Sequence, residues 1–212
     1  MTQPAGNCPN CGAKIVFRWS SSVQTVCEYC KSILIRTDVD LQRVGQVADL
    51  PADSSPIQIG TEGIYNRKAF VAIGRIIYEY EQGTWNEWHL MLNDGTSGWL
   101  SDAQDEYAVS FVAPGRKLPE AAAQCQVGQN FVWDNQRYTV TTLTNAHYRG
   151  VQGELPFQYW DKDDVMFVDL RSESGKFATI DYSDEKPVLY LGEMVEFDSL
   201  GLKNLRAFEG WS

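Results

Sequence analysis

Four cysteines near the N-terminus have the spacing of a metal site. Cys8 and Cys11 form one C-x-x-C pair, Cys27 and Cys30 form a second, and 15 residues separate the two pairs. This spacing is typical of zinc sites, in which four thiolates surround the ion tetrahedrally at about 2.3 Å. Because four protein ligands leave no open coordination position, we expect a structural Zn²⁺ and not a catalytic one.

Two other interpretations of the cysteines are disfavoured. Disulfides need an oxidising compartment, and a redox C-x-x-C motif is expected beside a βαβ pattern that this sequence lacks. The fifth cysteine, Cys125, stands alone, with no histidine near it in the sequence. We therefore expect Cys125 to be a packed side chain and not a nucleophile.

The motif Trp85-Asn86-Glu87-Trp88 is the most unusual local feature of the remaining chain. On a strand, Trp85 and Glu87 share one face and Trp88 lies on the other. As a binding surface, the motif would offer an aromatic face and a carboxylate to a cationic ligand such as a polyamine. As core, Trp88 would pack inward and Glu87 would pair with Arg75 on the preceding strand. Both interpretations stay open, with Trp85, Glu87 and Trp88 as candidate binding residues.

A second candidate is Glu154, within Gly153-Glu154-Leu155-Pro156. Its carboxylate could act as a general base, bind a cation, or cap backbone amides in a tight turn. Paired with Asp181 in a cleft between two repeats, it would supply the two carboxylates of a hydrolase or lyase. The chain has only two histidines, His89 and His147, and lacks the common phosphate-loop, hydrolase and metalloprotease motifs. An enzyme therefore stays an open alternative, but the sequence leans against it.

A small scaffold must position the cysteine pairs, and the residues between them predict one. Residues 14–19 are predicted to form a strand, 20–22 a turn, 23–26 a returning strand, and 32–36 a third strand. This is the layout of a zinc ribbon. Residues 1–36 are therefore predicted to form a ribbon whose folding depends on its metal.

The rest of the chain contains an internal repeat. Residues 59–66 match 127–134 at an offset of 68, whereas 108–111 match 188–191 at an offset of 80. The second copy therefore carries a 12-residue insertion, which we assign to residues 150–161. A loop that interrupts a repeat is a good place for function, and Glu154 lies within it.

Each copy is predicted to form five short strands. In the first copy, alternation and turn signals place them at about 59–65, 69–80, 86–93, 97–101 and 106–112. The predicted fold is all-β: a zinc ribbon followed by a duplicated β body, built as two five-stranded, barrel- or sandwich-like halves. The predicted boundaries are 1–36 for the ribbon, 37–56 for a linker, 57–113 for the first repeat, 114–126 for a connector, and 127–212 for the second repeat with its insertion and C-terminal tail.

The charge of the chain is uneven. The whole chain carries a formal charge of -10, but the first 36 residues carry +3 and the body carries -13. An acidic body repels phosphate backbones, so nucleic acid is an unlikely partner. The N-terminus resembles no signal peptide, and no stretch approaches the roughly 18 apolar residues of a membrane span. We therefore expect a cytoplasmic protein without a transmembrane segment.

Several segments carry a resemblance to a known family. They are Ile73-Gly74-Arg75-Ile76-Ile77-Tyr78, Trp85-Asn86-Glu87-Trp88, Gly98-Trp99-Leu100-Ser101, Gly153-Glu154-Leu155-Pro156 and Ile180-Asp181-Tyr182. Together they resemble the bacterial domain-of-unknown-function family 4178, and the leading ribbon is similar to that of many members. The family has no established activity. The resemblance implies a genomic setting near polyamine-synthesis and membrane-stress genes.

These observations together predict a cytosolic, non-enzymatic binding or adaptor protein. Its zinc ribbon would be structural or would dock a protein. Its acidic, aromatic-rich body would recognise a partner protein or a cationic small molecule, through residues that include Trp85, Glu87, Trp88, Glu154 and Asp181.

Overall fold

The computed structural model describes residues 5–37, 40–47, 50, 55–160 and 164–207. Strands dominate this part of the chain. Its helical segments are two 3₁₀ turns, η1 (Ala122–Gln124) and η2 (Phe197–Leu200). The all-β prediction is confirmed. No helix among the described residues is long and apolar enough to cross a membrane.

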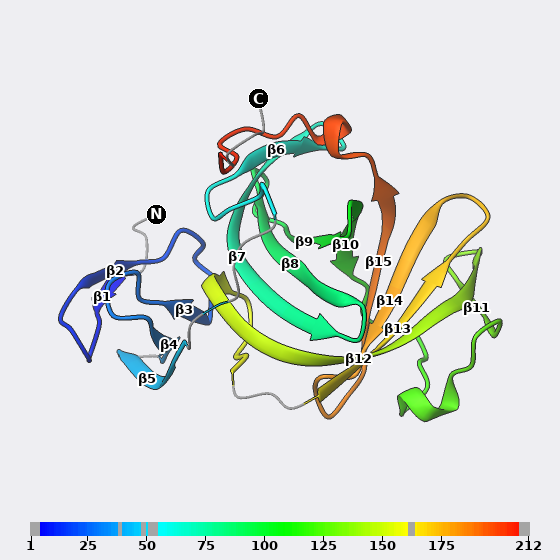
Figure 1. Ribbon diagram of the computed structural model, residues 1–212, viewed down its shortest axis with the longest axis horizontal. Helices are drawn as coiled ribbons and strands as arrows, with labels where there is room; N and C mark the ends of the chain where they lie inside the picture. Colours follow the sequence, from blue (N-terminus) through cyan, green and yellow to red (C-terminus); the bar gives the residue numbers. More distant parts are fainter. Residues whose placement is uncertain (1–4, 38–39, 48–49, 51–54, 161–163, 208–212) are drawn as a thin grey trace.

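Eight strands of the described chain close into one barrel (Figure 1). Their order is β7 (Lys68–Tyr80), β8 (Gly83–Leu92), β9 (Ser97–Ala103), β10 (Glu106–Val112), β15 (Val188–Val195), β14 (Lys176–Asp181), β13 (Asp164–Arg171) and β12 (Gln136–Leu155). The barrel closes where β12 pairs with β7. His147 of β12 lies opposite Asp164 of β13 and also opposite Glu79 of β7, so both edges of β12 are used.

The two predicted five-strand units are therefore not separate barrels. Each supplies four strands to the same barrel, while β6 (Glu62–Tyr65) and β11 (Asn130–Trp133) pair with β7 and β12 respectively. The physical reason is the length of β12, which spans 20 residues. Its C-terminal part extends beyond β13, and the backbone groups of that extension are satisfied by β7.

The two units contain equivalent hydrogen bonds. Gly60 donates its backbone N–H to Ala72 at 2.8 Å, and Gly128 donates to Val140 at 2.9 Å. A register shift between Ala72 and Gly74 also has a counterpart in β12, between Val140 and Thr142. These pairs repeat the sequence offset of 68, and a duplicated unit would contain them. The duplication itself stays a prediction.

Burial is greatest on the outward face of the barrel. Trp88 and Leu100 are fully buried there, beneath Ile57 and Leu200 from the segments that flank the first unit. On the second unit, Val168 and its neighbours lie beneath the 114–126 connector, where η1 and Cys125 pack. Cys125 is thus a packed side chain, as expected. These coverings leave the inward face of the barrel as the place for a cavity.

The ribbon extends further than its predicted boundary. It contains β1 (Ala5–Asn7), β2 (Lys14–Val16), β3 (Gln24–Val26), β4 (Ser32–Arg36) and β5 (Leu41–Gln46). β5 lies in the predicted linker, but it pairs with β4 and belongs to the ribbon sheet. Its apolar residues Leu41 and Val44 are the sequence signal for this strand, because Leu41 packs in the ribbon core and Val44 packs against the barrel.

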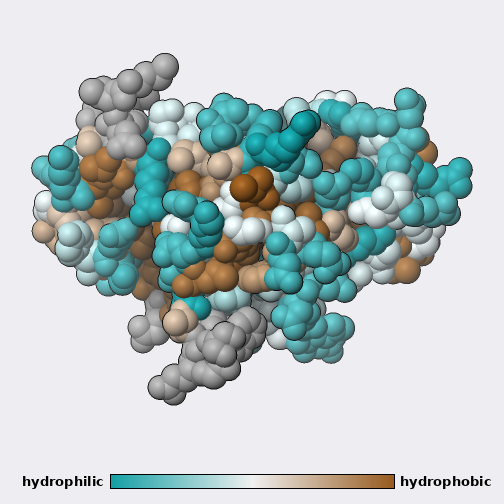
Figure 2. Space-filling view, turned by 90° about the horizontal axis from the view of Figure 1, so that it is seen from above, coloured by the Kyte–Doolittle hydropathy of each residue, from teal (hydrophilic) through white to brown (hydrophobic). Residues whose placement is uncertain are grey.

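The predicted insertion joins the ribbon to the barrel. Most of its described residues form the last part of β12, which pairs with β7 on one side. At its end, Glu154 lies opposite Thr25 and Leu155 lies opposite Gln24 of β3, so the ribbon sheet continues directly into β12. Figure 2 shows that on the face seen from above, apolar side chains form small patches interrupted by polar ones.

Candidate functional site

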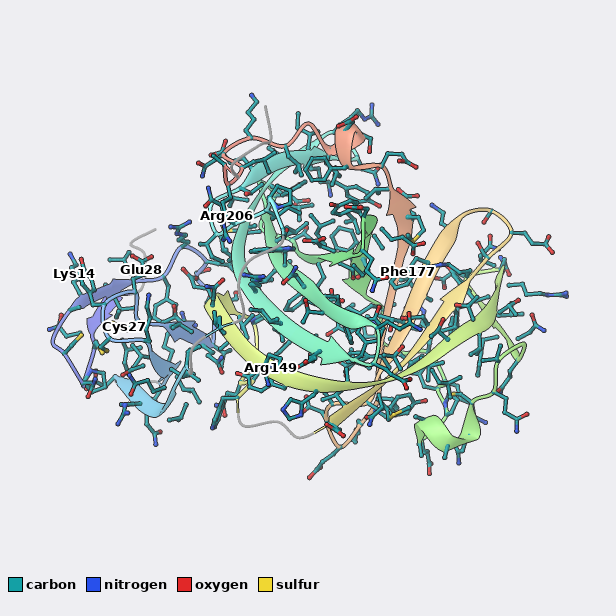
Figure 3. The ribbon with its side chains drawn as sticks, viewed as in Figure 1. Lys14, Cys27, Glu28, Arg149, Phe177 and Arg206 are labelled. Carbon is teal, nitrogen blue, oxygen red and sulfur yellow. The ribbon has the colours of Figure 1, made fainter. Side chains whose placement is uncertain are left out.

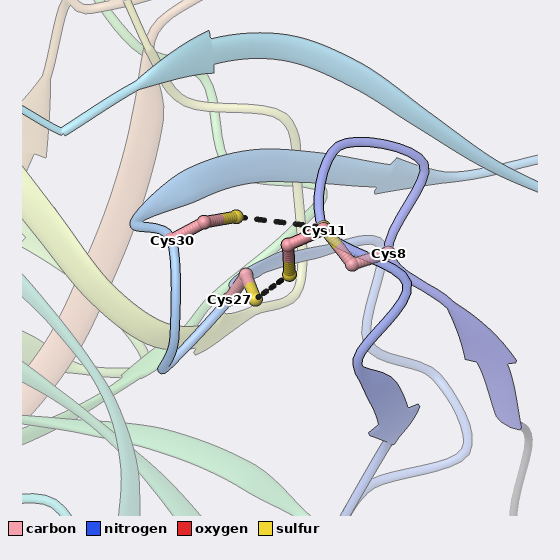
Figure 4. A group of neighbouring side chains, drawn as sticks. All are labelled: Cys8, Cys11, Cys27 and Cys30. Atoms are coloured by element: carbon pink, nitrogen blue, oxygen red, sulfur yellow. Dashed lines mark hydrogen bonds between the residues drawn. The ribbon is translucent and has the colours of Figure 1, made fainter.

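The four N-terminal cysteines converge from two loops (Figure 4). The Sγ atoms of Cys8 and Cys30 are 3.6 Å apart, those of Cys11 and Cys27 are 3.7 Å apart, and all four lie within 4.8 Å of one another. These contacts are too long for disulfides. A tetrahedron of thiolates at about 2.3 Å from a metal has edges of about 3.8 Å. The cluster therefore has the size and the donor atoms to hold one metal ion.

The two cysteine loops have the same backbone structure. The N–H of Cys8 donates to Ala13 at 2.8 Å, and the N–H of Cys27 donates to Ser32 at 2.9 Å. The residue after each second cysteine has a positive φ, 76° at Gly12 and 58° at Lys31. Glycine adopts this conformation readily, whereas lysine does so rarely, so only the first of the two loops has a residue suited to it.

The interior of the barrel is a cavity of about 800 Å³. Every barrel strand contributes residues to its wall. The inward-facing aromatic side chains include Tyr78, Trp85, Trp99, Phe157, Phe167, Phe177 and Tyr190; Phe177 is labelled in Figure 3. Carboxyl groups lie among them on Glu87, Asp169 and Asp181; Glu81 and Glu106 also belong to the lining, and Arg171 adds one guanidinium group. The cavity therefore combines an aromatic wall with acidic groups.

Glu87 is held by two neutral donors inside this cavity. The indole N–H of Trp85 donates to it at 3.1 Å, and the hydroxyl of Ser101 donates at 2.8 Å. Burial, with a smaller contribution from the carboxylates of Asp169 and Asp181, raises the pKa of the Glu87 carboxyl to about 8, against the effect of the two hydrogen bonds. Near neutral pH, Glu87 therefore holds a proton.

The predicted pairing of Glu87 with Arg75 does not occur. Arg75 of β7 lies opposite Trp88 of β8, whereas the residue opposite Glu87 is Ile76. Neighbouring residues of a strand face opposite ways, so Arg75 points outward. There its guanidinium donates to Asn86 Oδ1 at 2.6 and 2.8 Å and stacks over the Trp88 ring at 4.7 Å.

The other two carboxyl groups face Glu87 from the second unit. Burial raises the pKa of Asp169, while a hydrogen bond to Thr179 and the charge of Arg171 oppose that shift. Asp181 accepts a hydrogen bond of 2.7 Å from the backbone N–H of Ser183. Sequence analysis selected Asp181 but missed Asp169. The available signal was an acid within the alternating apolar run of residues 165–170, where a strand face would bury it.

One known family matches the part of the chain that forms the barrel. The family model described as Domain of unknown function (DUF4178) matches residues 58–197, which is more than half of the chain. The chain belongs to this family. No curated protein and no solved structure matches it. The matched region contains all of the barrel strands from β7 to β15 and excludes the cysteine cluster.

Glu154 lies at another place in the DUF4178 domain. Its carboxylate accepts hydrogen bonds from the backbone N–H groups of Arg18 at 2.7 Å and Trp19 at 3.2 Å, and from the hydroxyl of Ser22 at 2.6 Å. The carboxylate thus caps amides of the ribbon loop, one of the three roles considered from the sequence. Glu154 borders the groove between ribbon and barrel, whereas Asp181 lines the cavity, so the structure does not bring them together.

Two buried side chains lie at the joint between the ribbon and the DUF4178 domain, and one of them, Gln24, bonds across it. His89 Nδ1 lies 2.8 Å from the carbonyl oxygen of Glu154, so it must be the donor, and Nε2 accepts from Ser97 at 2.8 Å. Burial lowers the pKa of His89 to about 4, which keeps the ring neutral. Gln24 accepts from the Tyr159 N–H at 2.7 Å and donates to the Tyr159 carbonyl at 3.0 Å. Sequence analysis did not select Gln24, because its partner is 135 residues away.

Of the predicted binding residues, Trp85, Glu87 and Asp181 share the cavity. Trp85 stacks on Tyr78 at 4.9 Å between ring centroids and meets Phe167 edge-on at 5.6 Å. Trp88 is on the outward face and fully buried, as the core interpretation of the motif expected. The motif Trp85-Asn86-Glu87-Trp88 thus places Trp85 and Glu87 on the cavity face of β8 and Trp88 on its outward face.

Proposed function

We propose that the barrel of this DUF4178 protein is a binding site for a small organic cation, such as the polyamine spermidine, and that it catalyses no reaction. The observation that carries the proposal is the environment of Glu87. This carboxyl group lies in an aromatic cavity, faces two further carboxyl groups, and forms no hydrogen bond or ion pair with a lysine or arginine of the described chain.

The electrostatics of the cavity support a cation. An ionised carboxylate in such a place is disfavoured, because burial and its acidic neighbours both oppose the charge. An ammonium group beside Glu87 would offset both effects and stabilise the ionised form. Trp85, whose ring lines the cavity and is only partly buried, would add cation–π attraction, which is strongest for tryptophan and increases when water is excluded.

The proposal assigns the cysteine cluster a structural role as a zinc site. Zinc and iron both accept four thiolates in a tetrahedron, so the metal must be measured. Elemental analysis of protein purified without chelator should give close to one zinc per chain. Less than about half an equivalent of zinc, or iron in its place, would contradict this assignment. A cytoplasmic location fits it, because thiolates there stay reduced.

Calorimetric titration with spermidine tests the cavity. We expect binding to the wild type, at least tenfold weaker binding to Glu87→Gln, and unchanged binding to Glu185→Gln, which removes an exposed carboxylate elsewhere. At pH 7, binding should also release close to one proton, because the pKa of Glu87 falls from about 8 as the cation approaches. Repeating the titration in buffers with different ionisation enthalpies measures that proton.

Equal affinity of the wild type and Glu87→Gln for spermidine would remove this site. The hydrolase or lyase alternative needs Glu154 and Asp181 in one pocket. Since they line different cavities, and the Glu154 carboxylate is occupied by ribbon amides, we do not propose it.

A further inference from the structure

A second groove, of about 620 Å³, lies between the ribbon and the barrel. It is separate from the barrel cavity and shares no lining residue with it. Much of its floor is apolar and comes from both parts of the chain: Val16, Val47, Leu50, Ile59, Ile73 and Val151. Part of this surface is open, because Val16 is 45% exposed and the nearby ring of Tyr29 is 78% exposed.

The rim of the groove is basic. Lys14, Arg18 and Lys31 line it and are exposed. Among the described residues, the side chains of Lys14 and Arg18 form no hydrogen bond or ion pair, whereas the Lys31 ammonium donates to the carbonyl of Glu28 at 2.9 Å. Lys14 and Glu28 are labelled on the ribbon in Figure 3.

Acidic residues do not neutralise this rim. Glu154 borders the groove, but its carboxylate is turned to the backbone amides of Arg18 and Trp19. Glu28 is the one other acid in the lining. The lining thus holds three cationic and two acidic side chains, a formal charge of +1 in a chain whose net charge is -10.

One strand presents its edge to the groove. Neighbouring residues of a strand point to opposite faces, yet Lys14, Ile15 and Val16 are consecutive and all line the groove. Three consecutive residues can line the same groove where the edge of their strand, and not one of its faces, borders the groove. Among the described residues, β2 pairs with β1 alone, so its other edge carries no strand. A free edge is a template for an added strand.

We propose that this groove binds an acidic, extended segment of a partner protein, which adds as a strand to the free edge of β2 and places its carboxylates beside Lys14 and Arg18. Backbone hydrogen bonds to the strand edge would supply affinity, and the apolar floor would receive every second side chain. The carboxylates on the other side chains would set the preference for acidic sequences.

The charge of the whole chain favours a short acidic segment over a polyanion. A nucleic acid or an anionic membrane would bring many charges toward a protein of net charge -10 and would be repelled over its surface. A segment with a few carboxylates interacts mainly with the rim, because charges more than about 8–10 Å away are screened at physiological salt.

Fluorescence anisotropy with a labelled peptide of alternating valine and glutamate tests the proposal on the full chain. The wild type should bind it, with affinity that falls as salt rises. The double variant Lys14→Gln and Arg18→Gln should bind about tenfold more weakly, because it loses two rim charges. The matched control Lys117→Gln and Lys186→Gln removes two exposed cations outside the groove and should bind as the wild type does.

Three results would overturn the proposal. One is equal binding by both double variants. Another is equal binding of a valine and lysine peptide. A third is tighter binding of a glutamate-only peptide, a single-stranded oligonucleotide or anionic vesicles than of the alternating peptide. Since neither double variant changes a residue of the barrel cavity, spermidine titration of the same proteins separates failure here from failure of the cavity site.

Discussion

Trp85 donates its indole N–H to the carboxyl of Glu87, two residues along the same strand, at 3.1 Å. Both side chains face the barrel cavity, while Trp88 packs on the outward face. The bond orients Glu87 without adding a positive charge, so burial keeps the pKa of its carboxyl near 8. Because this carboxyl group stays protonated at neutral pH in the folded chain, it makes the free energy of unfolding depend on pH.

Glu87→Gln should flatten that pH dependence. The pKa of Glu87 is about 8 when folded and about 4.3 when unfolded, so the folded chain holds the proton more tightly. The stabilisation by this proton is fully present below about pH 4 and is lost as pH rises through 8. The wild type should therefore lose about 4 kcal/mol of this stabilisation between pH 4.5 and pH 8, whereas Glu87→Gln has no such proton to lose. Urea denaturation at both pH values measures this change.

Ser101→Ala provides the control for this titration. The Ser101 hydroxyl donates to Glu87 and favours its ionised form. Removing that hydroxyl should raise the pKa of Glu87 further and make the loss of stability at high pH steeper. Parallel pH profiles for the wild type, Glu87→Gln and Ser101→Ala would contradict the assignment.

Gln24→Ala should destabilise the joint between ribbon and barrel. The Gln24 amide is fully buried and bonds both backbone groups of Tyr159, whose hydroxyl contacts Tyr78 of the cavity wall at 2.6 Å. Alanine removes both of these buried hydrogen bonds, which should cost about 2–4 kcal/mol. Chemical denaturation measures the loss, and hydrogen exchange of the Tyr159 amide locates it.

Gln46→Ala is the matched control for Gln24. Its side chain also donates to a backbone carbonyl of the ribbon, that of Cys30 at 3.2 Å, but this bond is exposed. Water can replace it, so the change should be within about 0.5 kcal/mol. Similar losses for both variants would show that the Gln24 contact does not hold the joint.

How far the sequence predicts this structure depends on the range of the interaction. Alternation and turn residues predict the strands, and C-x-x-C spacing predicts the cysteine cluster, because these signals act within a few residues. Barrel closure through β7 and β12 depends on which strand edges meet, and no local pattern contains that. The same limit explains why the partner of Gln24 was missed and why Arg75 was paired with Glu87: a register shift of one residue reverses the face.

Gly192→Ala should disrupt the pairing of β10 with β15. Besides the pairing of β7 with β12, this is where the two units meet. Gly192 lies on β15 opposite Ser110 of β10, and a Cβ there would lie 1.9 Å from the carbonyl oxygen of Val109. Backbone must move to relieve this clash, so Gly192→Ala should lose more than about 3 kcal/mol or fail to fold. Gly95→Ala is the control. Nothing lies within 4 Å of its added Cβ, and its φ of +84° should cost only about 1 kcal/mol. Equal thermal stability of the two variants would contradict the close approach of β10 and β15.

Lys31→Gly should stabilise the ribbon, because Lys31 holds a φ of 58° that glycine adopts without strain. The gain should be about 1 kcal/mol in the metal-bound protein, measured by thermal unfolding. Lys31→Ala keeps the strained conformation and loses the bond to the Glu28 carbonyl, so it should show no gain. Gly12 has the equivalent position in the first cysteine loop, so Gly12→Ala should lower the stability of the metal-bound protein by a similar amount. Stabilisation by Lys31→Ala as well as by Lys31→Gly would indicate that the charge, and not the backbone, is responsible.

Glu154→Gln should weaken the attachment of the ribbon loop, which lies between the two cysteine pairs. The carboxylate accepts from Arg18 N–H, Trp19 N–H and Ser22 Oγ, whereas an amide has one accepting oxygen and would turn an NH₂ group toward these donors. Loss of charge-assisted bonds at a buried group should cost about 2–3 kcal/mol. Glu28→Gln, at an exposed position of the ribbon, should change stability by less than about 0.5 kcal/mol.

Faster metal transfer to a chelator in Glu154→Gln, but not in Glu28→Gln, would show that the Glu154 carboxylate also supports the metal site from the barrel side. Equal transfer rates, with equal stabilities, would show that the ribbon holds its metal and its position without Glu154.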